Sequence, residues 1–123
     1  MKKLFIVTIV ALMSISFSAC QNKFDPKKVA DDFSRIIIDN QNDCDKMAKE
    51  LSVLLDTNQQ ALLNFAKEEA KAGRSAKKAL TGDRELQSQS EDALVKCVEN
   101  EALNKVMARF AELFKKIDSI EKK

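Results

Sequence analysis

Apolar residues recur every three or four positions through most of this chain, which is the periodicity of an amphipathic α-helix. From Asp83 onward neither proline nor glycine occurs, and the apolar residues keep this spacing as far as Ile117. The sequence shows no strand-like alternation, no hairpin signal and no internal repeat. The pattern therefore predicts an all-α fold, a small bundle of about four helices with a long C-terminal helix.

The first two helices have recognisable starts. Asp25 can cap a helix N-terminus and Pro26 is favoured at the first helical position, so the first helix is expected to begin there. A polar run over residues 39–42 ends it. The second helix is expected over about residues 43–55, with Cys44 on its apolar stripe. The core face of the first helix is formed by Val29, Ala30, Phe33, Ile36 and Ile37.

The third and fourth helices follow two polar interruptions. Asp56 and Thr57 break the apolar pattern, and a capping box from Thr57 to Gln60 predicts a third helix that ends near residues 81–82. The last helix starts at Asp83. Because its full length exceeds what its neighbours can cover, we expect fraying before Ser88 or a bend near residues 99–100.

The N-terminal segment has a different character from the rest of the chain. Met1-Lys2-Lys3 leads into an apolar run over residues 4–13, and Ser16-Phe17-Ser18-Ala19-Cys20 follows. This arrangement resembles the signal of a bacterial lipoprotein, with Phe17 in a position where that family usually has Leu. The resemblance implies cleavage before Cys20 and lipidation of that cysteine. Gln21 after it favours the outer membrane over retention in the inner membrane.

This resemblance divides the chain into four parts. Residues 1–19 are the signal peptide, residues 20–24 the lipidated N-terminus and a short tether, residues 25–120 one helical bundle domain, and residues 121–123 a loose tail. Cleavage after Ser18 is the alternative. It would give a soluble secreted protein with an unmodified Cys20.

Lipidation of Cys20 leaves Cys44 and Cys97 as an even pair in an oxidising compartment. A single disulfide between them is the natural inference, and Cys97, like Cys44, lies on the apolar stripe of its helix. In the chain-entropy model such a bridge stabilises by about 4 kcal/mol. Two buried free thiols, or a soft-metal site that uses Cys44 and Met47, are the alternatives.

Composition excludes most catalytic chemistry. The chain has no His, Trp or Tyr, so imidazole-based triads and the commonest zinc ligand are missing. Gly73 and Gly82 are the only glycines, too few for a phosphate-binding loop. Without Lys2 and Lys3 the 21 basic residues become 19, equal to the 19 acidic ones, which removes the rationale for a nucleic-acid partner. We expect no catalytic residue, cofactor or metal.

One segment matches a calcium-loop template in its ligand positions but not in its turn. Cys44 stands where the sharp turn of such a loop requires glycine, so calcium binding is rejected. The matching ligand positions are Asp39, Gln41, Asp43, Asp45 and Glu50.

The expected function is that of a non-catalytic binding or structural module, anchored to the bacterial outer membrane through Cys20 and facing an envelope or periplasmic protein partner. Two alternatives stay open. The bundle is a carrier or sensor that holds an apolar ligand between the Phe65 and Phe110 faces, or it is a secreted soluble effector or inhibitor if Cys20 is not lipidated.

Overall fold

The computed structural model describes residues 24–122, and this part of the chain contains helices and no strand. The predicted all-α bundle is confirmed. In chain order the helices are α2 (Pro26–Asp39), α3 (Cys44–Lys71), α4 (Ala76–Ala79), α5 (Arg84–Val95) and α6 (Glu101–Glu121).

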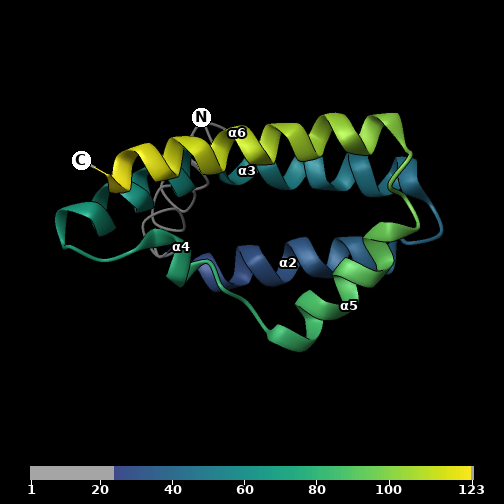
Figure 1. Ribbon diagram of the computed structural model, residues 1–123, viewed down its shortest axis with the longest axis horizontal. Helices are drawn as coiled ribbons and strands as arrows, with labels where there is room; N and C mark the ends of the chain where they lie inside the picture. Colours follow the sequence, from purple (N-terminus) through teal and green to yellow (C-terminus); the bar gives the residue numbers. More distant parts are fainter. Residues whose placement is uncertain (1–23, 123) are drawn as a thin grey trace, which may run out of the picture.

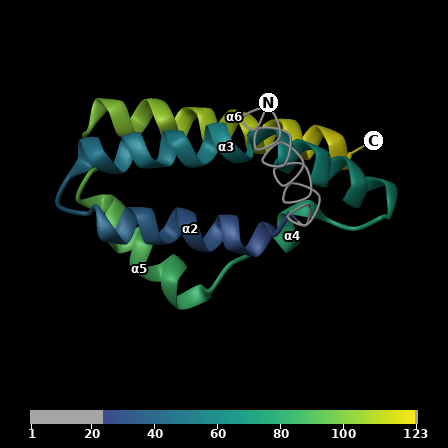
Figure 2. The ribbon, with the colours of Figure 1, turned by 180° about the vertical axis from the view of Figure 1, so that it is seen from behind.

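The long helices form two layers, with α3 beside α6 in one and α2 beside α5 in the other (Figures 1 and 2). The helices of the first layer run parallel, because residues near the start of one meet residues near the start of the other. Asn100 donates a hydrogen bond to Asp45 (Nδ2 to Oδ1, 3.0 Å), and Arg109 further along α6 donates to Ser52 of α3 (Nη1 to Oγ, 3.0 Å). In the second layer α5 packs on α2 and hardly touches α6.

The core lies mainly where α3 and α6 face each other, and α2 and α5 contribute fewer buried side chains. Each large apolar side chain buried there stabilises the fold by about 1.5–3 kcal/mol relative to an exposed one. The largest completely buried side chains are Ile37, Met47, Leu51, Leu55, Leu103, Ile117 and Cys97.

The expected break at Asp56 and Thr57 is wrong, because α3 continues through both residues to Lys71. Both side chains are exposed, and the buried stripe passes behind them from Leu55 to Leu62. Asp56 also forms an ion pair with Arg109 of α6, so this polar residue fastens the two helices together. Polar residues on the outer face of a helix interrupt the apolar pattern without ending the helix.

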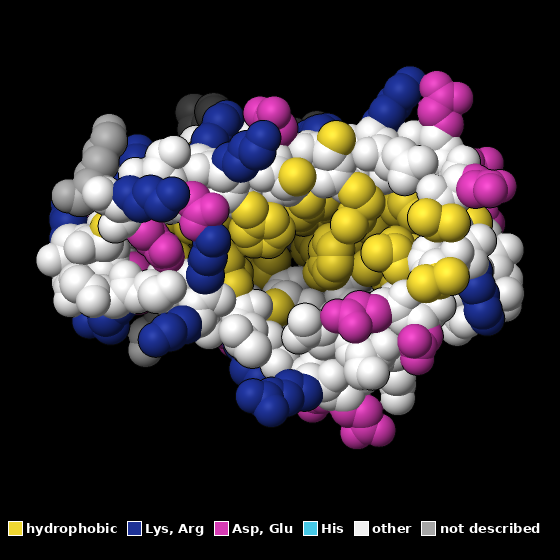
Figure 3. Space-filling view, viewed as in Figure 1, with side chains coloured by type: hydrophobic (Ala, Val, Ile, Leu, Met, Phe, Trp, Pro, Cys, Tyr) yellow, Lys and Arg dark blue, Asp and Glu magenta, His cyan; other side chains and the backbone are white. Residues whose placement is uncertain are grey.

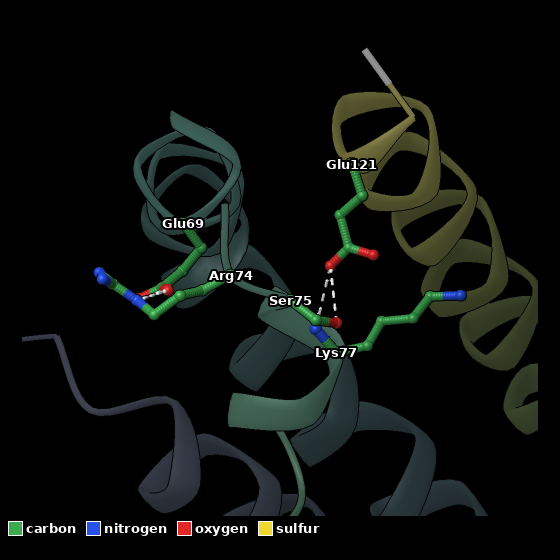
Figure 4. Close-up of polar contacts among 5 residues, drawn as sticks. All are labelled: Glu69, Arg74, Ser75, Lys77 and Glu121. Carbon is green, nitrogen blue, oxygen red and sulfur yellow. Dashed lines mark hydrogen bonds and ion pairs between the residues drawn. The ribbon is translucent and has the colours of Figure 1, made fainter. Parts of the chain in front are cut away.

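Gly73 ends α3 in a Schellman motif. Its φ is +73°, and two backbone bonds close the motif, from Gly73 N–H to the Ala70 carbonyl (3.1 Å) and from Arg74 N–H to the Glu69 carbonyl (2.8 Å). The Arg74 side chain turns back to the Glu69 carboxylate (Figure 4). This hydrogen bond and the Glu69 charge raise the already high pKa of Arg74.

The short helix α4 is held by the C-terminal end of α6. Glu121 Oε1 accepts hydrogen bonds from the Ser75 hydroxyl (3.3 Å) and from the Lys77 backbone N–H (3.2 Å), as Figure 4 shows. Lys77 forms an ion pair with Asp118 as well. The sequence prediction placed Glu121 in a loose tail, whereas here it belongs to α6 and anchors the start of α4.

The expected bend in the last helix is present, because α5 ends at Val95 and α6 begins at Glu101. The Asn100 side chain caps α6 by accepting a hydrogen bond from Leu103 N–H (2.8 Å). The expected fraying before Ser88 is wrong. Asp83 caps the start of α5, with its carboxylate accepting from the N–H groups of Glu85 (2.9 Å) and Leu86 (3.1 Å).

Candidate functional site

An apolar cavity of about 410 Å³ lies between the two layers, bounded by α2, α3, α5, α6 and the segment that joins α4 to α5. The cavity exists because α5 packs along α2 and leaves this side of α6 uncovered. Figure 3 shows hydrophobic side chains gathered in a hollow on this face of the molecule. A volume of this size is typical of small-molecule sites, which run from about 300 to 1,000 Å³. Its main apolar lining is Phe33, Ile37, Leu62, Leu80, Leu94, Phe110 and Phe114.

Phenylalanine side chains form much of the wall. The rings of Phe33 and Phe110 meet edge to face, with centroids 5.0 Å apart and planes at 76°, a favourable aromatic geometry. Phe110 is buried, whereas Phe114, one turn further along α6, keeps 42 % of its surface exposed. Phe114 is one of the apolar residues that keep helical spacing as far as Ile117, which predicts a core position for it. In the structure it lies beside an opening rather than inside a packed core.

The segment after α4 covers another part of the cavity and is fastened to α2. The backbone N–H of Asp83 donates to Asp31 Oδ1 at 2.9 Å. Gly82 passes so close to α2 that a Cβ there would collide with Asp31 Oδ1 and lie 3.2 Å from the Ala30 Cβ. A side chain at this position would therefore require the Asp31 carboxylate to move for the segment to lie against α2.

Two serines interrupt the apolar lining. Ser34 of α2 and Ser90 of α5 both line the cavity and retain only 7 % and 5 % exposure. The Ser90 hydroxyl donates its hydrogen to the Gln87 carbonyl (2.7 Å), so towards the cavity it offers lone pairs. Neither serine was predicted as a lining residue from the sequence. A small polar residue at a core-facing helical position is the signal that could have indicated both.

The charged residues of the lining are all acidic. Asp83 and Glu91 line the cavity, and none of the lysines and arginines between residues 24 and 122 does. The Asp83 carboxylate already accepts two N–H groups at the start of α5. Within residues 24–122, Glu91 forms no ion pair with a basic side chain.

A second depression, a groove of about 1140 Å³, runs between α2 and α3. Its lining mixes an apolar strip with charges of both signs, so it lacks the consistent chemistry of the smaller cavity. The basic members are Lys28, Arg35, Lys46 and Lys49, and the acidic ones are Asp25, Asp32, Asp39 and Glu50.

The cysteine pair lies at the other end of the bundle from α4. The sulfur atoms of Cys44 and Cys97 are 2.10 Å apart, and the bridge joins the start of α3 to the turn between α5 and α6. It thus ties the two layers together at that end and leaves the cavity lining free of sulfur. The signal peptide and the lipidation site Cys20 lie outside the described residues.

The prediction of a ligand space between the Phe65 and Phe110 faces is right for Phe110 and wrong for Phe65. Phe110 lines the cavity, but Phe65 packs on Phe24, with ring centroids 5.6 Å apart.

Of the rejected calcium template, Asp43 caps α3 by accepting from Lys46 N–H (3.1 Å), and Glu50 accepts from the Asn40 amide. Between residues 24 and 122 no group of three or more His, Cys, Asp or Glu side chains is arranged to hold a metal ion.

Comparisons with protein-family models, with curated proteins and with solved structures find no match to this chain. Among the described helices, none combines the length and the apolar character needed to cross a membrane.

Proposed function

We propose that this protein is a lipid-anchored, non-catalytic binding protein of the bacterial envelope, and that its ligand is a small molecule with an apolar body held in the cavity between the layers. The observation that carries the binding part is the cavity itself, an accessible space walled by Phe33, Phe110 and Phe114. Burying apolar surface there is favourable by about 25 cal/mol per Å².

The anchoring part is supported by the signal-like segment that ends at Cys20. Several acyl chains on one residue hold a protein firmly, whereas a single chain binds only marginally. Gln21, Asn22 and Lys23 alone separate Cys20 from Phe24, a span of about 14 Å at most. The bundle would therefore lie close to the lipid surface, where molecules with apolar parts accumulate.

A non-catalytic role is supported by the residue types available around the cavity. Its hydroxyl groups are those of Ser34, Ser90 and Thr81. With no histidine in the chain, none of them can be activated by imidazole. A ligand held there is recognised by shape, apolar contact and a few polar groups, as in typical small-molecule sites.

Intact mass spectrometry of protein expressed with its own signal tests the anchor. We expect a membrane-bound species that starts at Cys20, carries acyl groups and gains the mass of two hydrogen atoms on reduction. A soluble species that starts at Ala19 would contradict the anchor and favour a secreted effector.

Photolabelling tests the cavity in the intact protein. The full acylated chain in phosphatidylcholine vesicles is irradiated with an octanol analogue that carries a diazirine, and labelled peptides are located by mass spectrometry. We expect saturable labelling of the segments around Phe33, Ser90 and Phe114, competed by excess octanol. Unsaturable labelling spread over the surface would contradict ligand binding.

Two matched variants sharpen this test. Phe114→Ala removes part of the cavity wall, and we expect it to weaken saturable labelling severalfold. Val53→Ala is the control, because Val53 is also an exposed apolar residue (58 %) but lies on α3 outside the cavity lining. Equal losses in both variants would show that the labelling does not depend on this cavity.

A further inference from the structure

We propose that the ligand of this cavity carries a protonated amine, and that Glu91 and Ser90 together recognise it. The inference rests on the proposed ligand-binding function and adds the chemical class of the ligand. It follows from three observations on the polar groups of the cavity.

The first observation is the sign of the charges. Both charged side chains of the lining, Asp83 and Glu91, are acidic. In Figure 3 acidic side chains border the hollow on the side of α5 and a basic side chain borders its opposite end, while the lining itself includes no lysine or arginine of residues 24–122. A cavity with an acidic border attracts cations and repels carboxylates and phosphates.

The second observation is that the two carboxylates differ in their partners. Asp83 is occupied by the N–H groups of Glu85 and Leu86, and its charge lies at the N-terminus of α5, where the helix dipole partly balances it. Glu91 lies two turns further along α5, away from that end of the helix. No lysine or arginine of residues 24–122 pairs with it. Glu91 is therefore the carboxylate available to a cation in the cavity.

The third observation concerns the hydrogen-bonding direction at Ser90. Because its hydroxyl hydrogen is committed to the Gln87 carbonyl, its oxygen acts as an acceptor for anything in the cavity. Ser90 is adjacent in sequence to Glu91, and both line the cavity. An ammonium group, which has N–H donors and no acceptor, matches a lining that offers the Ser90 oxygen and the Glu91 carboxylate. A quaternary ammonium lacks those donors and fits less well.

The apolar wall accounts for the rest of the ligand. An alkyl or aromatic body contacts Phe33, Phe110 and Phe114, while the ammonium stays at the border beside Glu91. Since the carboxylate remains partly in water, the charge does not have to be buried. Such a ligand is an amphiphilic primary amine.

The test uses the full acylated chain in phosphatidylcholine vesicles and four photoreactive octyl probes of equal chain length: the primary amine, the trimethylammonium analogue, the alcohol and the carboxylate. We expect the amine to label the cavity peptides with half-saturation at about tenfold lower concentration than the alcohol, as charge-assisted hydrogen bonds imply. The trimethylammonium probe should fall between them, and the carboxylate should bind most weakly.

Variants separate recognition at the cavity from partition of the probes into the lipid. Glu91→Gln should remove most of the preference for the amine while labelling by the alcohol persists. Glu112→Gln, which removes the same charge from an exposed position of α6 outside the lining, should keep the preference. Ser90→Ala should reduce the advantage of the amine over the trimethylammonium probe.

The outcomes distinguish this inference from the proposed function. If all four probes label the cavity peptides with equal half-saturation, or if Glu91→Gln and Glu112→Gln behave alike, recognition of an amine is refuted and binding of apolar molecules stands. If no probe labels these peptides saturably, because a protein segment or a second copy of the chain fills the cavity, both the inference and the proposed small-molecule function are overturned.

Discussion

The two glycines of this chain are needed for different physical reasons. Gly73 has a positive φ of +73° and open space around it, so its constraint is conformational. Gly82 lies against α2, so its constraint is steric. Substitutions at the two sites should therefore respond differently to the choice of side chain.

At Gly73 we expect Ala to lower the free energy of unfolding by about 1–2 kcal/mol, because a Cβ is unfavourable in the left-handed region. Asn tolerates this region better and should cost less. Chemical denaturation of Gly73→Ala and Gly73→Asn measures the difference. Equal losses would mean that the αL geometry of the helix end is not what the substitution disturbs.

At Gly82 we expect Ala to displace the Asp31 carboxylate and to break its hydrogen bond with the Asp83 N–H. The loss of a bond of this kind costs about 1–3 kcal/mol. Hydrogen exchange of the Asp83 amide reports the local effect. In an Asp31→Ala background the additional loss from Gly82→Ala should shrink, and a fully additive double variant would argue against this collision.

At the scale of helices, capping residues predicted two boundaries correctly, whereas the capping box from Thr57 to Gln60 predicted a helix start inside α3 and was wrong. Asp25 with Pro26 predicted the start of α2, and Asn100 lay within the expected bend before α6. The interruption at Asp56 misled because a sequence does not reveal that a polar pair sits on the outer face of a continuing helix. The third helix, predicted to continue to about residues 81–82, was likewise too long, since α3 ends at Lys71 and only Ala76–Ala79 is helical beyond Gly73.

The disulfide is the covalent tie between α3 and the turn before α6. We expect the Cys44→Ser and Cys97→Ser double variant to lose about 4 kcal/mol of unfolding free energy, as the chain-entropy model gives for a sequence separation of 53. Each single variant should lose a similar amount, because either change removes the whole bridge. Additive losses from the two single variants, measured by denaturation, would contradict a bond between them.

The contact between α4 and α6 includes two hydrogen bonds to the Glu121 carboxylate and the ion pair of Lys77 with Asp118. Replacing Glu121 with Ala should expose the Lys77 amide to faster hydrogen exchange, while the overall free energy of unfolding falls by only about 1 kcal/mol. Glu112→Ala on the exposed side of the same helix is the control and should leave that amide protected. Unchanged protection in Glu121→Ala would show that α4 is held mainly by burial of Ala76.

For the molecule as a whole, the sequence predicted the number and class of helices better than their mutual arrangement. Phe110 was singled out as a wall of ligand space, but its partner is Phe33 and not Phe65. Helical spacing identifies which face of a helix is apolar, and it contains no information on which other face it meets. The parallel pairing of α2 with α5 and of α3 with α6 was beyond such reasoning for the same reason.

Filling the cavity should stabilise the fold and weaken ligand binding. Ser34→Leu adds apolar volume next to an existing space, so we expect the free energy of unfolding to rise by about 1 kcal/mol and the saturable labelling by octyl probes to fall. Denaturation and photolabelling on the same preparation check both effects. A decrease in stability would show that the surroundings of Ser34 are already filled, since overpacking is destabilising.

The contact between Phe24 and Phe65 decides which end of the molecule leads toward a lipid anchor. Phe65 lies near the C-terminal end of α3, the end that also carries α4 and Glu121, whereas Cys44 begins that helix of 28 residues. In a chain tethered at Cys20 the α4 end would therefore be the attached end, and the disulfide would lie roughly 40 Å from it along α3. The exposed Val95 and Val98 beside that bridge would then mark the end of the bundle farthest from the point of attachment.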